Sequence, residues 1–198
     1  MAPEDGSAGS RPADEEAEAA DARPGWREVL REDVRAHRGE LTSPGLHAVL
    51  VHRFGAALPR MPRSSQRAAR VLHRLAYVFL RNVYGIEIPA TVQLGRRVRI
   101  AHHTGVVIHR FAVIGDDCVL RHNVTLGARS DDPETYADQA PQLGAGVSLG
   151  TGAVVAGAVR IGAGARIAPN VTVLTDVPAG ATVRASPNEV RQRPAPTT

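Results

Sequence analysis

Beyond Ile86 the hydrophobic positions of the chain recur every six residues. The aliphatic members of this series are Ile88, Leu94, Ile100, Ile108, Ile114, Leu120, Leu126, Leu143, Leu149, Val155, Ile161, Ile167 and Val173. Four positions after each of these except Leu126 stands a small or β-branched residue: Val92, Val98, Thr104, Ala112, Cys118, Val124, Val147, Ala153, Val159, Ala165, Val171 and Val177. A sustained period of six is the signature of a parallel β-helix, in which each unit forms a short strand and a turn. The pattern therefore predicts a mainly β fold, a β-helix over residues 86–185.

Before Ile86 the hydrophobic residues recur at helical spacing instead. A first helix is expected over 26–34, a second from the N-cap Ser43 through Phe54, and a third from Ser64 or Ser65. The apolar face of the third helix comprises Val71, Leu72, Leu75, Val78, Phe79 and Val83. Residues 24–85 are therefore predicted to form a small α-helical region ahead of the β-helix.

The two ends of the chain read as tails. Residues 1–22 carry seven acidic residues and one basic residue among Ala, Gly, Ser and Pro, so residues 1–23 are expected to be disordered. Residues 186–198 form a second tail. The N-terminal segment lacks the apolar core of a signal peptide, and no apolar run is long enough to cross a bilayer. A cytoplasmic protein without a membrane partner is therefore expected.

Composition agrees with a narrow prism. Aromatic residues make up only 4% of the chain and glycine occurs 19 times, as expected where large rings do not fit inside the coils. The single cysteine, Cys118, excludes an internal disulfide and falls on a small interior position. All 24 basic residues are arginine, and they are spread along the chain without interleaved aromatics. Nucleic-acid binding is therefore not expected, and most arginines are interpreted as solvated helix surface.

The repeat is interrupted twice, and such interruptions are the places where function is most readily added to a regular fold. The first inserts two residues between Ile100 and Ile108 and carries His102 and His103. The second is an excursion over residues 128–142 that contains Asp131, Asp132, Glu134, Tyr136 and Asp138. Both are candidate parts of a functional site.

The chain resembles the serine O-acetyltransferases, hexapeptide-repeat acyltransferases that use acetyl-CoA. The motifs that carry the resemblance are Gly45–Gly55 in the helical part, Gly85–Ile88 at the start of the β-helix, His102–Gly105, Asn123–Gly127 and Asp176–Gly180 followed by Pro187. The resemblance implies a left-handed parallel β-helix in a homotrimer, or a dimer of such trimers, with acetyl-CoA bound between neighbouring β-helices. It implies transfer of acetyl to the hydroxyl of serine or a related small acceptor, without a metal.

The same resemblance assigns candidate site residues. The family's general base falls on His102, and its carboxylate partner falls on Glu87, where the family usually has Asp. Contacts to CoA fall on Gly127, Ala128, Arg129, Thr151, Arg166 and Pro169. The two arginines are candidates for the phosphates of CoA.

Two departures from the family concern the acceptor. The usual Asp before the catalytic histidine is Ala101, and the usual Arg-His-Pro triplet after the excursion is Gln139, Ala140 and Pro141. These changes predict altered or relaxed acceptor recognition, and His103, Asp131 and Asp132 are candidates to replace the missing contacts. Because the chain ends in Thr198 rather than Ile, no complex with the sulfhydrylase of cysteine synthesis is expected.

Two other functions remain open at this stage. In β-helix trimers of the γ-carbonic anhydrase type, three histidines bind zinc across a subunit interface. Here His102, His109 and His122 lie in adjacent turns, so a zinc hydratase is an alternative. A non-catalytic trimeric scaffold that has lost turnover is the other, given the two alanines in the acceptor motifs.

Overall fold

The structure is a computed structural model, and it describes residues 25–130 and 132–186. The helical region consists of α2 (Trp26–Ala36), α3 (Pro44–Ala57), the 3₁₀ turn η1 (Leu58–Arg60), α4 (Arg63–Phe79) and the π-helical turn η2 (Leu80–Tyr84). Ser43 precedes α3 as expected, but its side chain caps no backbone group. The third helix begins at Arg63, directly after its N-cap residue Pro62, rather than at Ser64 or Ser65. The predicted tails lie outside the described residues, apart from Ser186.

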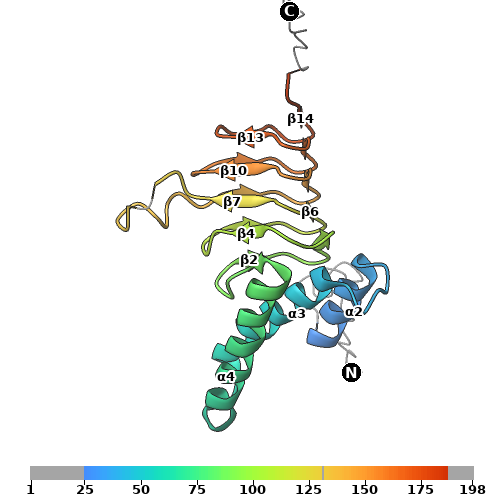
Figure 1. Cartoon of the computed structure of the whole chain (residues 1–198), viewed down its shortest axis with the longest axis vertical. Coiled ribbons are helices and arrows are strands. Elements are labelled where there is room, and N and C mark those ends of the chain that lie inside the picture. Colours follow the sequence, from blue (N-terminus) through green and yellow to red (C-terminus); the bar gives the residue numbers. More distant parts are fainter. Residues whose placement is uncertain (1–24, 131, 187–198) are drawn as a thin grey trace, which may run out of the picture.

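The rest of the described chain is the expected left-handed parallel β-helix, drawn as the stacked arrows of Figure 1. Its strands are β1 (Ile86–Glu87), β2 (Gln93–Leu94), β3 (Arg99–Ala101), β4 (Val106–Ile108), β5 (Val113–Ile114), β6 (Val119–Arg121), β7 (Thr125–Gly127), β8 (Gln142–Leu143), β9 (Ser148–Leu149), β10 (Val154–Ala156), β11 (Arg160–Ile161), β12 (Arg166–Ile167), β13 (Thr172–Val173) and β14 (Thr182–Val183). They form three parallel sheets. Sheet A contains β1-β4-β7-β10-β13, sheet B contains β2-β5-β8-β11, and sheet C contains β3-β6-β9-β12-β14. Each coil visits the three sheets in turn, so the coils have three corners, which we name C–A, A–B and B–C after the sheets they join.

The interior is the column of aliphatic residues that the repeat predicts. Leu120, Leu126, Leu149 and Val155 are fully buried, and burial of each such side chain stabilises the fold by about 1.5–3 kcal/mol. Cys118 lies in this column, where burial raises the pKa of its thiol to about 11. The structural interpretation of Cys118 is therefore the one that its surroundings support.

One interior position was assigned wrongly. Thr104 is exposed, and Val106 is buried in its place. The two inserted residues lie before the interior position rather than after it, so Ile86 pairs with Val106, twenty residues on, whereas Val107 pairs with Thr125, eighteen residues on. The insertion therefore enlarges the C–A corner that carries His102 and leaves the core in register.

Buried polar contacts fix the helices onto the first coil. Asp33 is completely buried and accepts hydrogen bonds from Arg53, which also donates to the carbonyls of Leu94 and Gly95. A Cβ at Gly45 would overlap the Ile100 carbonyl oxygen, so only glycine allows α3 to lie this close to β3. These contacts place the α2–α3 connection beside the C–A corner.

The apolar face predicted for the third helix exists, but it is not covered within the protomer. Val71, Leu72, Leu75 and Val83 are each more than 60% exposed. Phe79, on the same face, is half exposed. Exposed apolar area of this extent on one helix is typical of an interaction surface. No helix in the described ranges is long and apolar enough to cross a membrane.

Candidate active site

The first interruption of the repeat places two histidines on an enlarged corner. His102 follows β3 directly, and both His102 and Thr104 adopt positive φ angles, 62° and 95°. Gly105 has a positive φ of 68°, which favours glycine, and a Cβ there would also crowd Asn123. Non-glycine residues in this region of conformational space are strained, and such strain accumulates at functional sites. The corner thus presents His102 and His103 on the surface in a fixed conformation.

His102 opens onto a pocket of about 320 Å³ between β3 and the α2–α3 connection. Ala101 lines the same pocket, so the structure brings together the predicted base and the predicted acceptor position. The His122 ring stands edge-on to the His102 ring, with 5.8 Å between centroids. The His102 imidazole is thus one of the groups that a molecule in this pocket would meet.

His37, which is buried, also lines this pocket. The Nδ1–H of His37 donates to the Asp33 carbonyl at 2.8 Å, and the Ile100 amide donates to His37 Nε2 at 3.2 Å. Burial lowers the pKa of His37, which keeps the ring neutral, as accepting a hydrogen bond at Nε2 requires. His37 therefore joins α2 to β3 next to His102. The sequence analysis did not select it.

Glu87 does not contact His102 in the protomer. It lies on the outer face of β1, opposite Val107 of β4, and among the described residues no hydrogen bond joins it to His102. Its neighbour is Tyr77 on α4. Burial, together with the Glu87 carboxylate, raises the pKa of the Tyr77 hydroxyl to about 12. The proposed dyad of Glu87 and His102 thus stays a prediction, and the structure gives the carboxylate a different partner.

His103 points to the helical region. Its ring lies 6.1 Å from the ring of Tyr84, whose hydroxyl is 3.5 Å from His47 Nδ1. His103 does not line the pocket that contains His102 and Ala101. The structure therefore places this acceptor-binding candidate outside the pocket.

The residues expected to contact CoA fall on two separate corners. Thr151 and Pro169 share the C–A corner with His102, where backbone hydrogen bonds stack successive turns: Asn123 donates to Thr104, Gly152 to His122 and Asn170 to Thr151. Arg166 lies exposed on sheet C near this column. Gly127, Ala128 and Arg129 lie at the opposite edge of sheet A, on the A–B corner. One protomer therefore does not gather the six residues into a single groove.

Arg129 already has partners in the protomer. Its guanidinium donates to the Ala156 carbonyl at 3.2 Å and to the Leu174 carbonyl, and its side chain lies over Gly157. These contacts hold the guanidinium against the rim of the A–B corner, beside a pocket of about 360 Å³. Its position on the rim is compatible with a phosphate ligand, while its hydrogen bonds give it a structural role as well.

The second interruption extends from the A–B corner as the long loop visible in Figure 1. The Gln139 side-chain oxygen accepts hydrogen bonds from the backbone amides of Arg129 and Ser130, at 2.8 and 3.0 Å, and closes the base of the loop. Ala140 is buried beneath it. Asp132 caps the turn of the loop through the Glu134 amide, and Asp131 lies outside the described residues. Within one protomer Asp132 and Ala140 therefore lie across sheet A from His102.

The three histidines of the zinc alternative are not gathered in the protomer. His102 and His122 are neighbours on the C–A corner, whereas His109 is buried on the A–B corner with its ring 4.3 Å from that of Tyr136. No group of three or more His, Cys, Asp or Glu side chains within residues 25–130 and 132–186 is arranged to hold a metal ion.

Three arginines of the pocket were also missed by the sequence analysis. Arg38, Arg99 and Arg121 line it together with His102. Two of them stand beside interior residues of the repeat, Ile100 and Leu120, and this outward placement was the available signal. Arg38 comes from the helical region, and only the folded structure shows that it lies here.

Comparisons with known proteins agree with this architecture. Residues 140–175 match the family model described as bacterial transferase hexapeptide (six repeats). The serine acetyltransferase of Mycobacterium tuberculosis is 39% identical over 143 residues, covering 67% of this chain and 58% of that protein. The serine acetyltransferase of Helicobacter pylori is 40% identical over 134 residues, covering 66% of this chain and 73% of that protein.

A solved structure gives the same result. The crystal structure of serine acetyltransferase from Brucella abortus in complex with coenzyme A superposes with a TM-score of 0.70 and 26% identity, over 86% of this chain and 69% of that one. Sequence similarity, the repeat and the helical region joined to it all lead to one assignment. The chain belongs to the serine acetyltransferase family.

Proposed function

We propose that this protein transfers an acetyl group from acetyl-CoA to the hydroxyl of serine or a related small acceptor, with His102 as the general base. The observation that carries the proposal is the position of His102, on a strained corner at the mouth of a pocket of about 320 Å³. The relatives support the reaction class, since they are named serine acetyltransferases and one was crystallised with coenzyme A.

The chemistry needs one proton acceptor at the hydroxyl. His102 takes the hydroxyl proton while the acceptor oxygen forms its bond to the thioester carbonyl carbon. The carbon–sulfur bond then breaks, and the proton passes from the imidazolium to the departing thiolate to give free CoA. A positioned base of this kind contributes about 10²–10⁴-fold in rate. In the proposal Glu87 supports the imidazolium through an arrangement that forms only in the complete enzyme.

The proposed active form is a homotrimer, and a dimer of trimers is compatible with it. Two observations support association: the CoA-binding candidates lie on two corners of the prism, and the apolar face of α4 is exposed. If neighbouring β-helices lie side by side, the C–A corner of one protomer faces the A–B corner of the next. Thr151, Arg166 and Pro169 of one protomer and Gly127, Ala128 and Arg129 of its neighbour would then border one acetyl-CoA site. The proposed location is the cytoplasm.

Thiol release tests the proposal. We expect purified protein to release CoA thiol from acetyl-CoA in the presence of L-serine, and His102→Ala to lower kcat about 10²–10⁴-fold with the affinity for CoA retained. Calorimetric titration with CoA measures that affinity. The matched variant is His103→Ala, on the same exposed corner. If kcat falls in His103→Ala but not in His102→Ala, the general base is His103 and the assignment of His102 is wrong. Stoichiometric zinc in the active protein would favour a hydratase instead.

A further inference from the structure

The pocket beside His102 is lined by more positive charge than an acetyl-transfer step requires. Arg38, Arg99 and Arg121 all line it, and among the described residues Glu40 is the only acidic one that does so. Arg38 comes from the α2–α3 connection, with a positive φ of 61°, whereas Arg99 and Arg121 lie on adjacent strands of sheet C. Segments distant in sequence thus deliver three guanidinium groups to one cavity.

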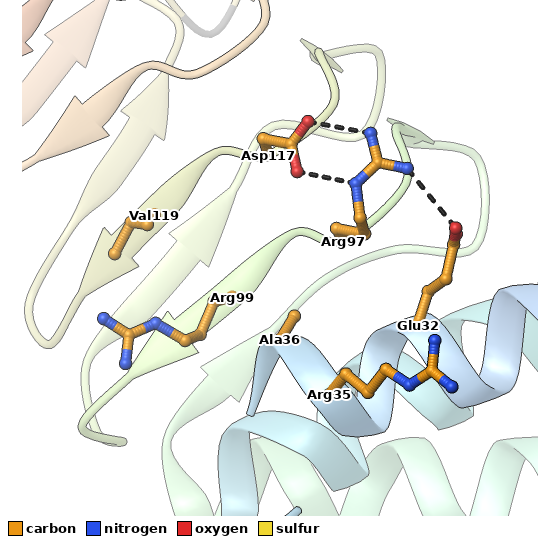
Figure 2. Close-up of a pocket in the computed structure, with 7 residues that line it drawn as sticks. All are labelled: Glu32, Arg35, Ala36, Arg97, Arg99, Asp117 and Val119. Carbon is orange, nitrogen blue, oxygen red and sulfur yellow. Dashed lines mark hydrogen bonds and ion pairs between the residues drawn. The ribbon is translucent and has the colours of Figure 1, made fainter. Parts of the chain in front are cut away.

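These guanidiniums lack acidic partners among the described residues, unlike others nearby. Arg53 is paired with Asp33, Arg96 with Glu32, and Arg97 with Asp117 at 2.6 Å. Figure 2 shows the contrast: Arg97 is held between Asp117 and Glu32, while the guanidinium of Arg99 points away from them and has no partner among the residues drawn. Ion pairing is therefore available on this surface, but the arginines of the pocket do not use it.

The uncompensated charge of the three arginines makes this pocket favourable for an anion. Burial, together with the nearby charges of Arg38 and Arg121, lowers the pKa of Arg99. Arg121 donates to Ser148 Oγ and to the Leu149 carbonyl, at 3.2 and 3.3 Å, so neutral oxygens are its only partners in the described structure. Like charges gathered in a half-buried cavity repel one another unless an anion neutralises them. An arginine fork is well suited to bind a carboxylate or a phosphate.

Ala101 leaves the pocket without an acidic side chain next to His102 that could bind an ammonium group. A side chain that binds an ammonium group must be an acceptor, and among the residues lining the pocket only Glu40 carries a carboxylate. Ala101 lies directly beside His102, and its methyl side chain offers no polar atom. The surroundings of His102 therefore favour binding of a negatively charged acceptor and contribute little to binding of an amino group.

We propose that the acceptor of this enzyme is a small hydroxylated anion, recognised through its acidic group by Arg38, Arg99 and Arg121, with no requirement for an amino group. The proposal rests on the proposed function, because it assigns the substrate class of the same site. A volume of about 320 Å³ holds a compound of the size of a hydroxy acid.

Acceptors that differ from serine by one group test the charge requirement. 3-Hydroxypropionate keeps the hydroxyl and the carboxylate of serine without the amine, and L-serinamide keeps the hydroxyl and the amine without the carboxylate. We expect kcat/KM for 3-hydroxypropionate to equal or exceed that for L-serine, and kcat/KM for L-serinamide to be at least about 100-fold lower than for L-serine. Glycerate, glycerol 3-phosphate and uncharged glycerol separate a carboxylate acceptor from a phosphate acceptor. A 3-hydroxypropionate rate more than tenfold below that of serine, or full activity with L-serinamide, overturns the proposal.

Variants of the arginines test which ligand the charge serves. Arg99→Gln should raise KM for the anionic acceptor at least about tenfold and leave KM for acetyl-CoA within about twofold. The control is Arg60→Gln, since Arg60 is exposed on the turn between α3 and α4, remote from the pocket. If Arg99→Gln instead raises KM for acetyl-CoA alone, the three arginines bind the phosphates of CoA and the proposal is wrong.

Direct binding separates this proposal from the proposed function. Calorimetric titration of the CoA-saturated protein with 3-hydroxypropionate, and in parallel with L-serinamide, requires no turnover. Binding of the first but not the second supports the anionic pocket, even if thiol release fails for every acceptor and the acetyltransferase function is wrong. Equal binding of both, or binding of 3-hydroxypropionate that survives in Arg99→Gln, overturns the anionic pocket even in an active enzyme.

Discussion

Single buried histidines tie the stability of this protein to pH. His52 is buried where α3 meets the first coil, and its Nε2–H donates to the Val92 carbonyl at 3.0 Å while Nδ1 has no partner in the described structure. Burial lowers the pKa of His52 to about 4. The unfolded chain takes up this proton near pH 6.5, so the stability due to neutral His52 is complete above pH 6.5 and is lost as the pH falls towards 4.

We predict that the free energy of unfolding falls between pH 7 and pH 4.5, with His52 accounting for about 2–3 kcal/mol of the fall. His37, His73 and His109, whose pKa values are also lowered by burial, add to the loss. Urea unfolding of wild type and His52→Gln at both pH values measures the effect, because glutamine can donate to Val92 but does not titrate. The exposed His103→Gln serves as control. An unchanged pH dependence in His52→Gln would show that His52 is solvated.

The sequence pointed to some residues of the candidate pocket but not to others, and the reason is their separation along the chain. His102 was found because a two-residue slip in a strict period is visible locally. The arginine pocket was not found, since Arg38 and Arg99 are brought together only by the packing of α3 against β3 through Gly45. Thr104 was placed in the interior because the period alone does not show on which side of an insertion the register resumes.

At the scale of elements, the described residues of the excursion, 128–130 and 132–142, form an extension of the A–B corner that side-chain hydrogen bonds hold at its base. The Gln139 side chain accepts two backbone hydrogen bonds at its base and donates to Thr135 Oγ1 at 3.0 Å. In the family resemblance this position carries an arginine, and here the amide has taken a structural role. The sequence predicted the excursion but could not show that Gln139 folds back on it.

We predict that Gln139→Ala loosens the loop and leaves the β-helix intact, because the two amides it leaves are exposed and can bond to water. Limited proteolysis should cut within 128–142 at least about fivefold faster, while the midpoint of thermal unfolding changes by less than about 2 °C. Gln142→Ala is the matched control, since that side chain is exposed on β8 and makes no described hydrogen bond. Equal cleavage rates in the two variants would mean that the amide contacts do not hold the loop.

At the scale of the molecule, the prism holds the candidate residues for CoA on two separate corners, C–A and A–B. The regular stacking that buries the aliphatic column also fixes the C–A and A–B corners on opposite edges of sheet A, so no movement within a coil can join them. The repeat made the prism and its interior predictable from sequence. A contact between two copies would leave no such period in the sequence, so the sequence pattern alone could not show how the two corners come together.

Mixed oligomers test whether two protomers share a site. We combine His102→Ala, which lacks the base on the C–A corner, with Arg129→Glu, which disrupts the A–B corner, and assay at acetyl-CoA concentrations well below KM. Each variant alone should retain less than a tenth of the activity. Because random mixing gives one interface in about four with both corners intact, co-expressed variants should recover about a quarter of wild-type activity. Co-expression of His102→Ala with Thr151→Arg, on the same corner, is the control and should recover none, because that pair leaves no interface with an intact C–A corner. If the first mixture gains no activity over its parents, acetyl-CoA binds within one protomer and the apolar face of α4 serves another contact.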